Sequence, residues 1–419
     1  MSTDPGRLNK HSMTMKLFKY HPATVFLCFF ILSCSTDSES ESTEIFTLNT
    51  FSNPPWGGEV IPETGEFESG ETVEITAIPG EKDEEGYWIF EEWLGIESDN
   101  ENPMTVTMNS DKNITATFLQ VKDWMQKADF EGNGRWHGVG FSIGGKGYVT
   151  SGFDGSPAPL NDFWEYAPES DTWSQRADFP GGGRLNAVAF SIGNKGYFGT
   201  GTMWDPESQS AVRQNDFWEY DPEENRWTRL ADFGGTGRHS AVGFSIGNKG
   251  YVGTGHDENS SRLRDFWEYD PETDSWTQIS DFPGEGRVSA FGFSIGDKGY
   301  VGKGLAGVYE NDFWEYNPQT DTWTQITDYP GEGRAGSVGF TIGGKLYLGT
   351  GDAGGINPTD DFWEYDPQTD SWNQVADFEG GLRRFGFGFT IDGQGYLGAG
   401  HDGNPGNYES DFWEFNPDR

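Results

Sequence analysis

The feature that most constrains the fold is a segment that recurs six times after residue 122. Each copy begins at an arginine, and a tyrosine follows that arginine by thirteen residues. A period of about 40 to 50 residues is typical of a propeller blade or a solenoid unit. The chain is therefore expected to stack six similar units. The arginines are Arg135, Arg184, Arg238, Arg287, Arg334 and Arg383, and the tyrosines are Tyr148, Tyr197, Tyr251, Tyr300, Tyr347 and Tyr396.

Each copy predicts four strands, which we call a, b, c and d in chain order. Strands a and b are mostly apolar runs joined by a glycine-rich turn such as Gly247-Asn-Lys-Gly250, a pattern typical of a hairpin. Strand c carries Asp-Phe-Trp-Glu followed by Tyr or Phe, and in the first five copies a tryptophan eleven residues after its aspartate marks strand d. The six copies thus predict twenty-four strands. The aspartates are Asp162, Asp216, Asp265, Asp312, Asp361 and Asp411, and the tryptophans are Trp173, Trp227, Trp276, Trp323 and Trp372.

The strand d that the sixth copy lacks is found before the first copy. The chain ends at Arg419, before the sixth tryptophan is due, but Trp124 precedes Arg135 by the same eleven residues that separate Trp173 from Arg184. We expect the Trp124 strand to pair with strand c of the sixth copy. Such pairing closes the ring and leaves no open sheet edge between the first and last units.

The order of these residues resembles kelch repeats, which run Arg, Gly-Tyr, a glycine pair, Tyr-Asp-Pro and Trp. The resemblance covers residues 122–419 and departs only at the glycine pair, which is Gly-Thr-Gly or a similar triplet in most copies. It implies an all-β fold over residues 120–419, a six-bladed propeller with four-stranded blades. The count of repeats agrees with this implication.

The N-terminal residues predict export and a lipid anchor. Residues 1–14 have no evident role and read as a non-native extension, whereas residues 15–33 have a basic start and an apolar run too short to span a bilayer. Ile31-Leu-Ser-Cys34 resembles a bacterial lipobox, which implies lipidation at Cys34 in the cell envelope, at the outer membrane and with exposure at the surface. A plain secretory signal is the alternative. The acidic, serine-rich residues 34–44 are expected to be a tether.

Residues 45–119 differ in composition from the repeats and predict five short strands. The strands are expected around Glu59-Val-Ile-Pro, Thr72-Val-Glu-Ile-Thr-Ala, Trp88-Ile-Phe-Glu-Glu-Trp, Met104-Thr-Val-Thr-Met and Ile114-Thr-Ala-Thr-Phe. This segment resembles the divergent InlB B-repeat, a small β-grasp-like module. The resemblance implies a stalk or an adhesive spacer in a surface protein.

The loops between strands b and c are the variable part of the repeat. The distances from the strand b tyrosine to the strand c aspartate are 14, 19, 14, 12, 14 and 15 residues, whereas the other spacings are fixed. Loops on a rigid scaffold commonly carry binding residues, and in a propeller these loops share a face with the d-a connections. Aromatic rings beside polar groups suit carbohydrate stacking or a protein hot spot, although Trp204 could instead cover its own long loop. The candidate ligand-binding residues are Phe153, Trp204, His256, Tyr309, Asp352 and His401.

Two roles are open for the six arginines. Near the mouth of a central channel they could form a positive ring for a carboxylate or sulfate. However, each arginine follows an aspartate by six residues, which favours a structural salt bridge between neighbouring units. The expected partners are Asp129, Asp178, Asp232, Asp281, Asp328 and Asp377.

Charge and residue content exclude several functions. A formal net charge of −40 argues against nucleic acid and against direct binding to anionic membrane, which leaves a lipid anchor as the membrane contact. The chain has two cysteines, Cys28 and Cys34, so a mature protein lipidated at Cys34 has no disulfide. His137, His239, His256 and His401 show no metal-ligand spacing, and no cofactor is expected.

Two function classes remain. The first is a monomeric, non-catalytic surface lipoprotein that binds a protein or glycan through the face of the b-c and d-a loops. The second follows from the resemblance to six-bladed kelch propellers that act as sialic acid mutarotases, which implies a sugar-modifying enzyme at the channel mouth. No residue matches a catalytic motif of that family clearly enough to be assigned.

Overall fold

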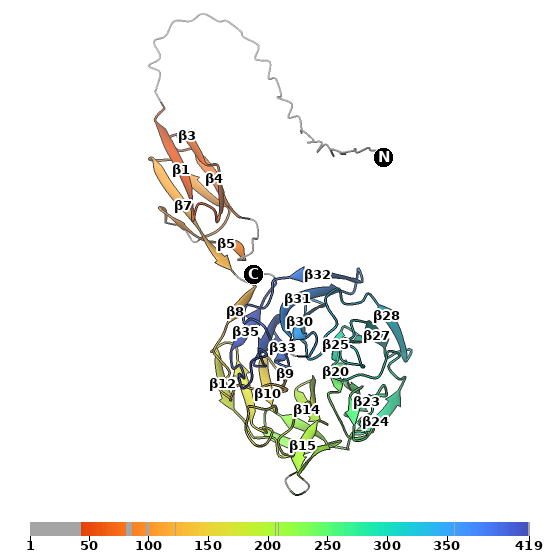
Figure 1. The fold of residues 1–419 in the computed structure, drawn as a ribbon. Coiled ribbons are helices and arrows are strands. Elements are labelled where there is room, and N and C mark those ends of the chain that lie inside the picture. Colours follow the sequence, from red (N-terminus) through yellow and green to blue (C-terminus); the bar gives the residue numbers. More distant parts are fainter. Residues whose placement is uncertain are drawn as a thin grey trace, which may run out of the picture.

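The structure is a computed structural model that describes residues 43–80, 86–97, 100–121, 123–205, 207, 209–355 and 357–417. The signal peptide, Cys34 and most of the tether lie outside the described residues, so these predictions stay predictions. All regular elements of the described residues are β-strands (Figure 1). No helix within these ranges is long and apolar enough to cross a membrane.

The N-terminal strands form two small sheets, with the strand orders β3-β1-β7-β5 and β2-β4-β6. All five expected strands are present, and β1 and β3 were not predicted. β3 escaped prediction because Phe67 is its only large apolar residue, and no residue of the strand is fully buried. The strands are β1 (Ile45–Asn53), β2 (Gly58–Ile61), β3 (Thr64–Glu68), β4 (Thr72–Pro79), β5 (Tyr87–Leu94), β6 (Met104–Thr107) and β7 (Lys112–Val121).

The repeats form six four-stranded antiparallel sheets, which we number 1 to 6 in chain order. Strands a are β9 (Val139–Ile143), β13 (Val188–Ile192), β20 (Val242–Ile246), β25 (Phe291–Ile295), β29 (Val338–Ile342) and β33 (Phe387–Ile391). Strands b are β10 (Lys146–Thr150), β14 (Lys195–Gly199), β21 (Lys249–Gly253), β26 (Lys298–Gly302), β30 (Lys345–Asp352) and β34 (Gln394–Gly398). Strands c are β11 (Phe163–Ala167), β17 (Phe217–Asp221), β23 (Phe266–Asp270), β27 (Phe313–Asn317), β31 (Pro358–Asp366) and β35 (Phe412–Phe415). Strands d are β12 (Thr172–Gln175), β18 (Arg226–Arg229), β24 (Ser275–Ile279), β28 (Thr322–Ile326), β32 (Ser371–Val375) and β8 (Trp124–Gln126).

The sixth sheet draws its strand d from the other end of the repeat region. β8 pairs with β35 in an antiparallel register that sets Trp124 opposite Phe415. The Trp124 side chain is only 1 % exposed, and its ring lies 4.8 Å from that of Phe415 and 5.0 Å from that of Phe362. β8 and β35 accordingly lie side by side in Figure 1.

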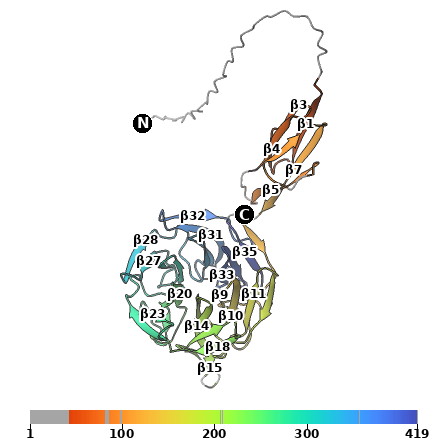
Figure 2. The same cartoon turned by 180° about the vertical axis from the view of Figure 1, so that it is seen from behind.

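Aromatic packing and backbone bonds join each sheet to its neighbour. The strand d indole of each sheet donates to a backbone carbonyl of the preceding sheet, as Trp276 does to Ala231 O at 3.4 Å. The same bond joins Trp124 to Ala376 O at 3.3 Å and Trp173 to Ala128 O at 3.2 Å. Gly400 N of sheet 6 also donates to Arg135 O of sheet 1 at 2.7 Å. The sheets surround a common centre (Figure 2).

Two other pairs of short strands lie outside the six sheets. β15 (Thr202–Asp205) and β16 (Ser210–Arg213) pair in the longest loop, and the two-residue strands β19 (Arg238–His239) and β22 (His256–Asp257) pair beside sheet 3. Figure 1 shows β15 at the outer rim of the ring of sheets.

Candidate binding site at the channel mouth

The six repeat arginines pair with the aspartates of the strand c motif in their own sheets. Arg238 donates from Nη1 to Asp265 Oδ1 at 2.8 Å and from Nη2 to Asp265 Oδ2 at 2.7 Å. The predicted partner, the aspartate six residues before each arginine, is wrong. Asp232 lies at the exposed end of strand d and pairs with Arg229 at 2.8 Å. The observed pairs are Arg135 with Asp162, Arg184 with Asp216, Arg238 with Asp265, Arg287 with Asp312, Arg334 with Asp361 and Arg383 with Asp411. The other expected partners, Asp129, Asp178, Asp281, Asp328 and Asp377, instead accept from the glutamine three residues before them.

Backbone carbonyls and an aromatic ring complete the surroundings of each arginine. Arg238 donates to Thr254 O at 2.9 Å and to Thr236 O at 3.1 Å, and its guanidinium lies 4.7 Å from the centre of the Phe233 ring. None of the six arginines is more than 3 % exposed. These guanidinium groups therefore face their aspartates and do not form a free positive ring at the channel mouth.

At the mouth, each sheet contributes one pair of side chains that differs from sheet to sheet. The residue after each repeat arginine forms a backbone bridge to the residue that follows the last glycine at the end of strand b, such as Gly152 in sheet 1. Trp136 and Phe153, for example, exchange two backbone hydrogen bonds of 3.1 and 3.0 Å. We call these residues the mouth pairs. They are Trp136 with Phe153, Leu185 with Thr202, His239 with His256, Val288 with Leu305, Ala335 with Asp352, and Arg384 with His401.

The pairs of sheets 5, 6 and 1 meet in one continuous cluster. The Trp136 ring lies 5.2 Å from that of His401, and the Arg384 guanidinium lies 5.6 Å from the centre of the Trp136 ring. Arg384 is 7 % exposed and its Nη1 lies 3.2 Å from Asp352 Oδ2. Tyr408, from the b-c loop of sheet 6, lies 5.9 Å from Phe153 and 5.8 Å from His401.

Tyr309 adds the b-c loop of sheet 4 to the cluster. Its hydroxyl lies 3.4 Å from Asp352 Oδ2 and accepts from Gly355 N at 3.2 Å. We call the whole set the mouth cluster. It consists of Trp136, Phe153, Tyr309, Asp352, Arg384, His401 and Tyr408.

A small axial cavity adjoins the mouth cluster. Five backbone hydrogen bonds of 2.9 to 3.1 Å run between the sheets around it, for example from Ser289 N to Ser240 O. The cavity holds about 160 Å³, and a second cavity of about 170 Å³ continues inwards between the six strands a. Ligand pockets usually measure about 300 to 1,000 Å³, so a larger ligand could insert only a single group here. The ring residues around the first cavity are His137, Asn186, Ser240, Ser289, Gly336 and Phe385.

The mouth cluster carries one positive and one negative side chain, Arg384 and Asp352, at pH 7. Burial, with a smaller contribution from Arg384, lowers the pKa of His137 to about 3, and burial lowers the pKa of His239 to about 4. Burial and Arg384 also lower the pKa of His401. The histidines are therefore uncharged, and Asp352 balances the charge of Arg384. This neutrality contrasts with the net charge of −40 of the whole chain.

The structure brings together four of the six predicted ligand residues. Phe153, Tyr309, Asp352 and His401 belong to the mouth cluster. His256 belongs to the mouth pair of sheet 3, where its ring lies 5.3 Å from that of His239. Trp204 lies on the β15–β16 hairpin and is 45 % exposed.

Sequence reasoning missed Trp136, Arg384 and Tyr408. A signal was present for the first two, because the residue after each repeat arginine is a different amino acid in every copy, whereas the residue before it is glycine in five of the six copies. Tyr408 lies in a loop of irregular length, so no repeat position marks it.

Comparisons with known proteins identify both parts of the chain. Residues 48–122 match the model of the divergent InlB B-repeat domain, and residues 238–283 and 333–379 match the model of the Kelch motif. No curated protein matches the chain.

Among solved structures, that of YjhT is similar to this chain with a TM-score of 0.60 and 17 % identity. The match covers 68 % of this chain and 95 % of that one, and at this identity it shows a shared fold. The chain therefore joins a divergent InlB B-repeat domain to a β-propeller with kelch repeats.

Proposed function

We propose that sheets 1 to 6 are the blades of one closed propeller and that the protein is a non-catalytic binding module. The closure is supported by the β8–β35 pairing and by the bond from Gly400 to Arg135. The module would recognise a protein or a glycan through the mouth cluster. The observation that carries this proposal is the contrast between buried positions that repeat in all six sheets and mouth pairs that differ in each.

The chemistry of the mouth cluster suits such recognition. Trp136, Phe153 and Tyr408 offer apolar ring surface, and the ion pair of Arg384 and Asp352 lies buried beside them. Tryptophan, tyrosine and arginine are the residues most enriched at binding hot spots. Each repeat needs the same residues for packing, so a position that escapes this requirement is free to serve a ligand.

A sugar-modifying enzyme of the sialic acid mutarotase type is the alternative. It needs a cation at the mouth for the sugar carboxylate, and the six repeat arginines are committed to their aspartates. Arg384 is the remaining arginine of the mouth cluster, and it is paired with Asp352. These contacts favour the binding module.

The proposal is tested by comparing wild type with Trp136→Leu, which places at the mouth of sheet 1 the residue that sheet 2 carries as Leu185. Both proteins are applied to a glycan array and used as bait for surface proteins. The matched control is Trp204→Leu, which removes an exposed tryptophan outside the mouth cluster. We expect Trp136→Leu to weaken binding about tenfold or more, since hot-spot truncations cost about 2 kcal/mol or more, and we expect Trp204→Leu to bind normally.

Equal binding by wild type and Trp136→Leu would refute the mouth cluster as the site. Isothermal titration with N-acetylneuraminate, followed by an anomer-exchange assay, tests the enzyme alternative. Accelerated exchange would establish catalysis and overturn the proposed non-catalytic role.

We further propose that the protein is a monomer held at the bacterial outer membrane by a lipid on Cys34. The support is the lipobox-like Ile31-Leu-Ser-Cys34. Metabolic labelling with a fatty acid should mark the wild type and leave Cys34→Ala unlabelled. Labelling of both proteins, or of neither, would contradict the lipid anchor.

A further inference from the structure

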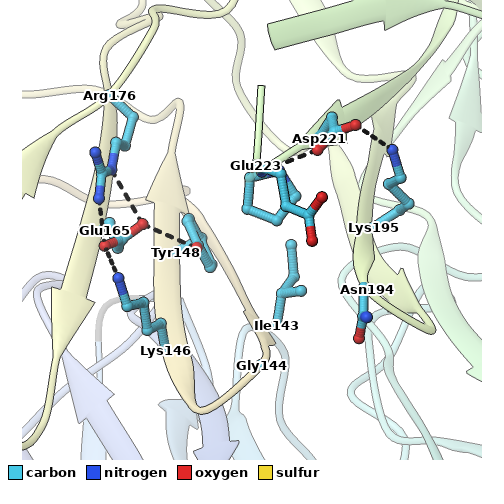
Figure 3. Close-up of a pocket in the computed structure, with 11 residues that line it drawn as sticks. Ile143, Gly144, Lys146, Tyr148, Glu165, Arg176, Asn194, Lys195, Asp221 and Glu223 are labelled. Carbon is cyan, nitrogen blue, oxygen red and sulfur yellow. Dashed lines mark hydrogen bonds and ion pairs between the residues drawn. The ribbon is translucent and has the colours of Figure 1, made fainter. Parts of the chain in front are cut away.

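A third pocket, drawn in Figure 3, lies between sheets 1 and 2 and is lined by residues of their a-b and c-d turns. These turns lie at the end of the sheets opposite the mouth cluster. Its volume is about 470 Å³, within the range of small-molecule sites. One wall carries Lys146 and Arg176 of sheet 1. The other wall carries Lys195, and Glu223 lies between the two walls in Figure 3.

Sheet 1 departs from the repeat at two positions near this pocket. Arg176 occupies the strand d position that is apolar in sheets 2 to 5, where Leu230, Ile279, Ile326 and Val375 stand. Ala167 occupies the position that is Asp or Asn in the other five sheets, such as Asp221 in sheet 2. Both departures make the wall of sheet 1 more positive than its counterparts.

The extra cation is not required to neutralise the buried carboxylate beside it. Glu165 is 5 % exposed and accepts from Lys146 at 2.6 Å, from Tyr148 at 2.9 Å, and from Arg176 at 2.6 and 3.0 Å. In sheet 6, where glutamine replaces the strand b lysine, Lys127 supplies one cation to Glu414 at 3.5 Å. In sheets 3 and 5, the strand b lysine is the one cation among the described residues that pairs with the corresponding glutamate, so the second cation of sheet 1 is surplus.

Both cations of sheet 1 keep unused donors that reach solvent. The Lys146 side chain is 43 % exposed and that of Arg176 is 33 % exposed. A lysine has three N–H donors and an arginine five, and Glu165 takes one from Lys146 and two from Arg176. The remaining donors have no partner among the described residues and suit a carboxylate oxygen.

The opposite charge is also available in the pocket. The Glu223 side chain is exposed and has no hydrogen-bond or ion-pair partner within the described part of the chain. By contrast, the carboxylate of Asp221 on the same wall is bound by Lys195. A free carboxylate facing surplus cations fits a ligand that carries both charges.

We propose that this pocket binds a zwitterion, an α-amino acid or short peptide, with its carboxylate on Lys146 and Arg176 and its ammonium on Glu223. The net charge of the molecule supports this choice. A protein with a net charge of −40 repels a simple anion, whereas a zwitterion has no net charge to be repelled. The site lies apart from the mouth cluster and does not depend on the function proposed there.

Saturation-transfer NMR on the whole protein tests the proposal with the common amino acids and alanylalanine as probes. Propionate and ethylammonium, which carry one charge each, are the comparison ligands. We expect at least one zwitterionic probe to bind about tenfold more tightly than either, because a charge-assisted hydrogen bond contributes about 1.5 to 3 kcal/mol. No saturation by any zwitterion, or equal binding of propionate, would overturn the proposal.

Three variants locate the binding. Arg176→Leu introduces the residue that sheet 2 has at this position, Leu230, so we expect the variant to fold. Its affinity for the zwitterion should be about tenfold lower than that of wild type. Glu223→Gln should bind the zwitterion no more tightly than the wild type binds propionate. The matched control, Arg229→Gln, removes the same charge from strand d of sheet 2, where sheet 1 has Gln175, and should bind as wild type. Unchanged binding by Arg176→Leu, with an unchanged melting temperature, would contradict the assignment.

Discussion

Individual side chains reveal what holds the repeats together, and the buried arginine is the clearest case. Arg238 makes two hydrogen bonds to Asp265 and two to backbone carbonyls, and Trp267 Nε1 also donates to Asp265 at 2.8 Å. Removal of Asp265 leaves a buried guanidinium without its counter-charge, which costs about 3 to 5 kcal/mol. We therefore expect Asp265→Ala to lower the free energy of unfolding by that amount in urea titrations.

The control for this prediction is Asp232→Ala. Asp232 stands six residues before Arg238 and has an exposed partner, and exposed pairs contribute only about 0 to 1 kcal/mol. Comparable losses in the two variants would show that the observed pairing does not stabilise the sheet.

Lys303 is a residue whose replacement should stabilise the protein. It occupies the position of Thr254 in sheet 3, is 1 % exposed, and its ammonium has no hydrogen-bond partner among the described residues. The ammonium lies 3.8 Å from the centre of the Tyr329 ring. Burial, with a smaller contribution from Arg334, lowers the pKa of Lys303 well below its usual value. We expect Lys303→Met to raise the free energy of unfolding by about 1 to 4 kcal/mol at pH 7.

The same substitution should change the pH dependence of stability. A lysine whose pKa is lowered on folding binds more protons in the unfolded chain, so wild-type stability increases with pH up to the unfolded pKa of about 10.4. The advantage of Lys303→Met should therefore shrink between pH 7 and pH 10, as measured by thermal unfolding of both proteins. An advantage that stays constant or grows would contradict a lowered pKa.

The pairing of Arg238 shows where reasoning from the repeat ends. Asp232 and Asp265 both recur in every copy, one six residues before the arginine and the other at the start of the strand c motif, so the repeat alone cannot decide which carboxylate the arginine reaches. The choice depends on how the d-a connection turns inwards, which places the guanidinium over Phe233 and away from Asp232.

At the scale of elements, the strand assignments followed from the sequence because each strand carries its own marker. The Gly-rich turns, the strand c motif and the strand d tryptophan each recur, and all twenty-four expected strands are present. β1 and β3 of the N-terminal domain have no such repetition, and β3 has no buried side chain. The mouth cluster could be predicted only in part, because Trp136 and His401 are adjacent only after the first and last sheets meet.

The contact between the first and last sheets depends on β8. Trp124 is 1 % exposed and its ring packs against those of Phe340, Phe362 and Phe378 in sheet 5 and Phe415 in sheet 6. We expect Trp124→Ala to lower the free energy of unfolding by about 3 to 5 kcal/mol in urea titrations. Met125→Ala, which removes an exposed side chain of the same strand, is the control and should cost less than about 0.5 kcal/mol. A loss in Trp124→Ala no larger than in the control would show that β8 is dispensable.

At the scale of the whole molecule, both proposed sites depend on the ring of sheets. The mouth cluster joins sheets 4, 5, 6 and 1, so it exists only if sheet 6 meets sheet 1. The zwitterion pocket needs only sheets 1 and 2, which are consecutive in the chain. An open ring would therefore remove the first site and spare the second.

The measurement that tests the closed ring most directly is a disulfide between β8 and β35. Gln126 lies opposite Trp413, between the backbone bonds from Lys127 N to Phe412 O and from Asn416 N to Asp123 O. Alternation along an antiparallel ladder makes Gln126 and Trp413 a non-hydrogen-bonded pair, whose Cα atoms lie about 4.5 Å apart and suit a disulfide.

The test protein carries Gln126→Cys and Trp413→Cys with Cys28→Ser and Cys34→Ser. The control exchanges Trp363 of sheet 5 for cysteine in place of Trp413. The closed ring predicts an intramolecular disulfide in the first protein and none in the control, as read by non-reducing electrophoresis and mass spectrometry. Free thiols or intermolecular dimers in the first protein would contradict it.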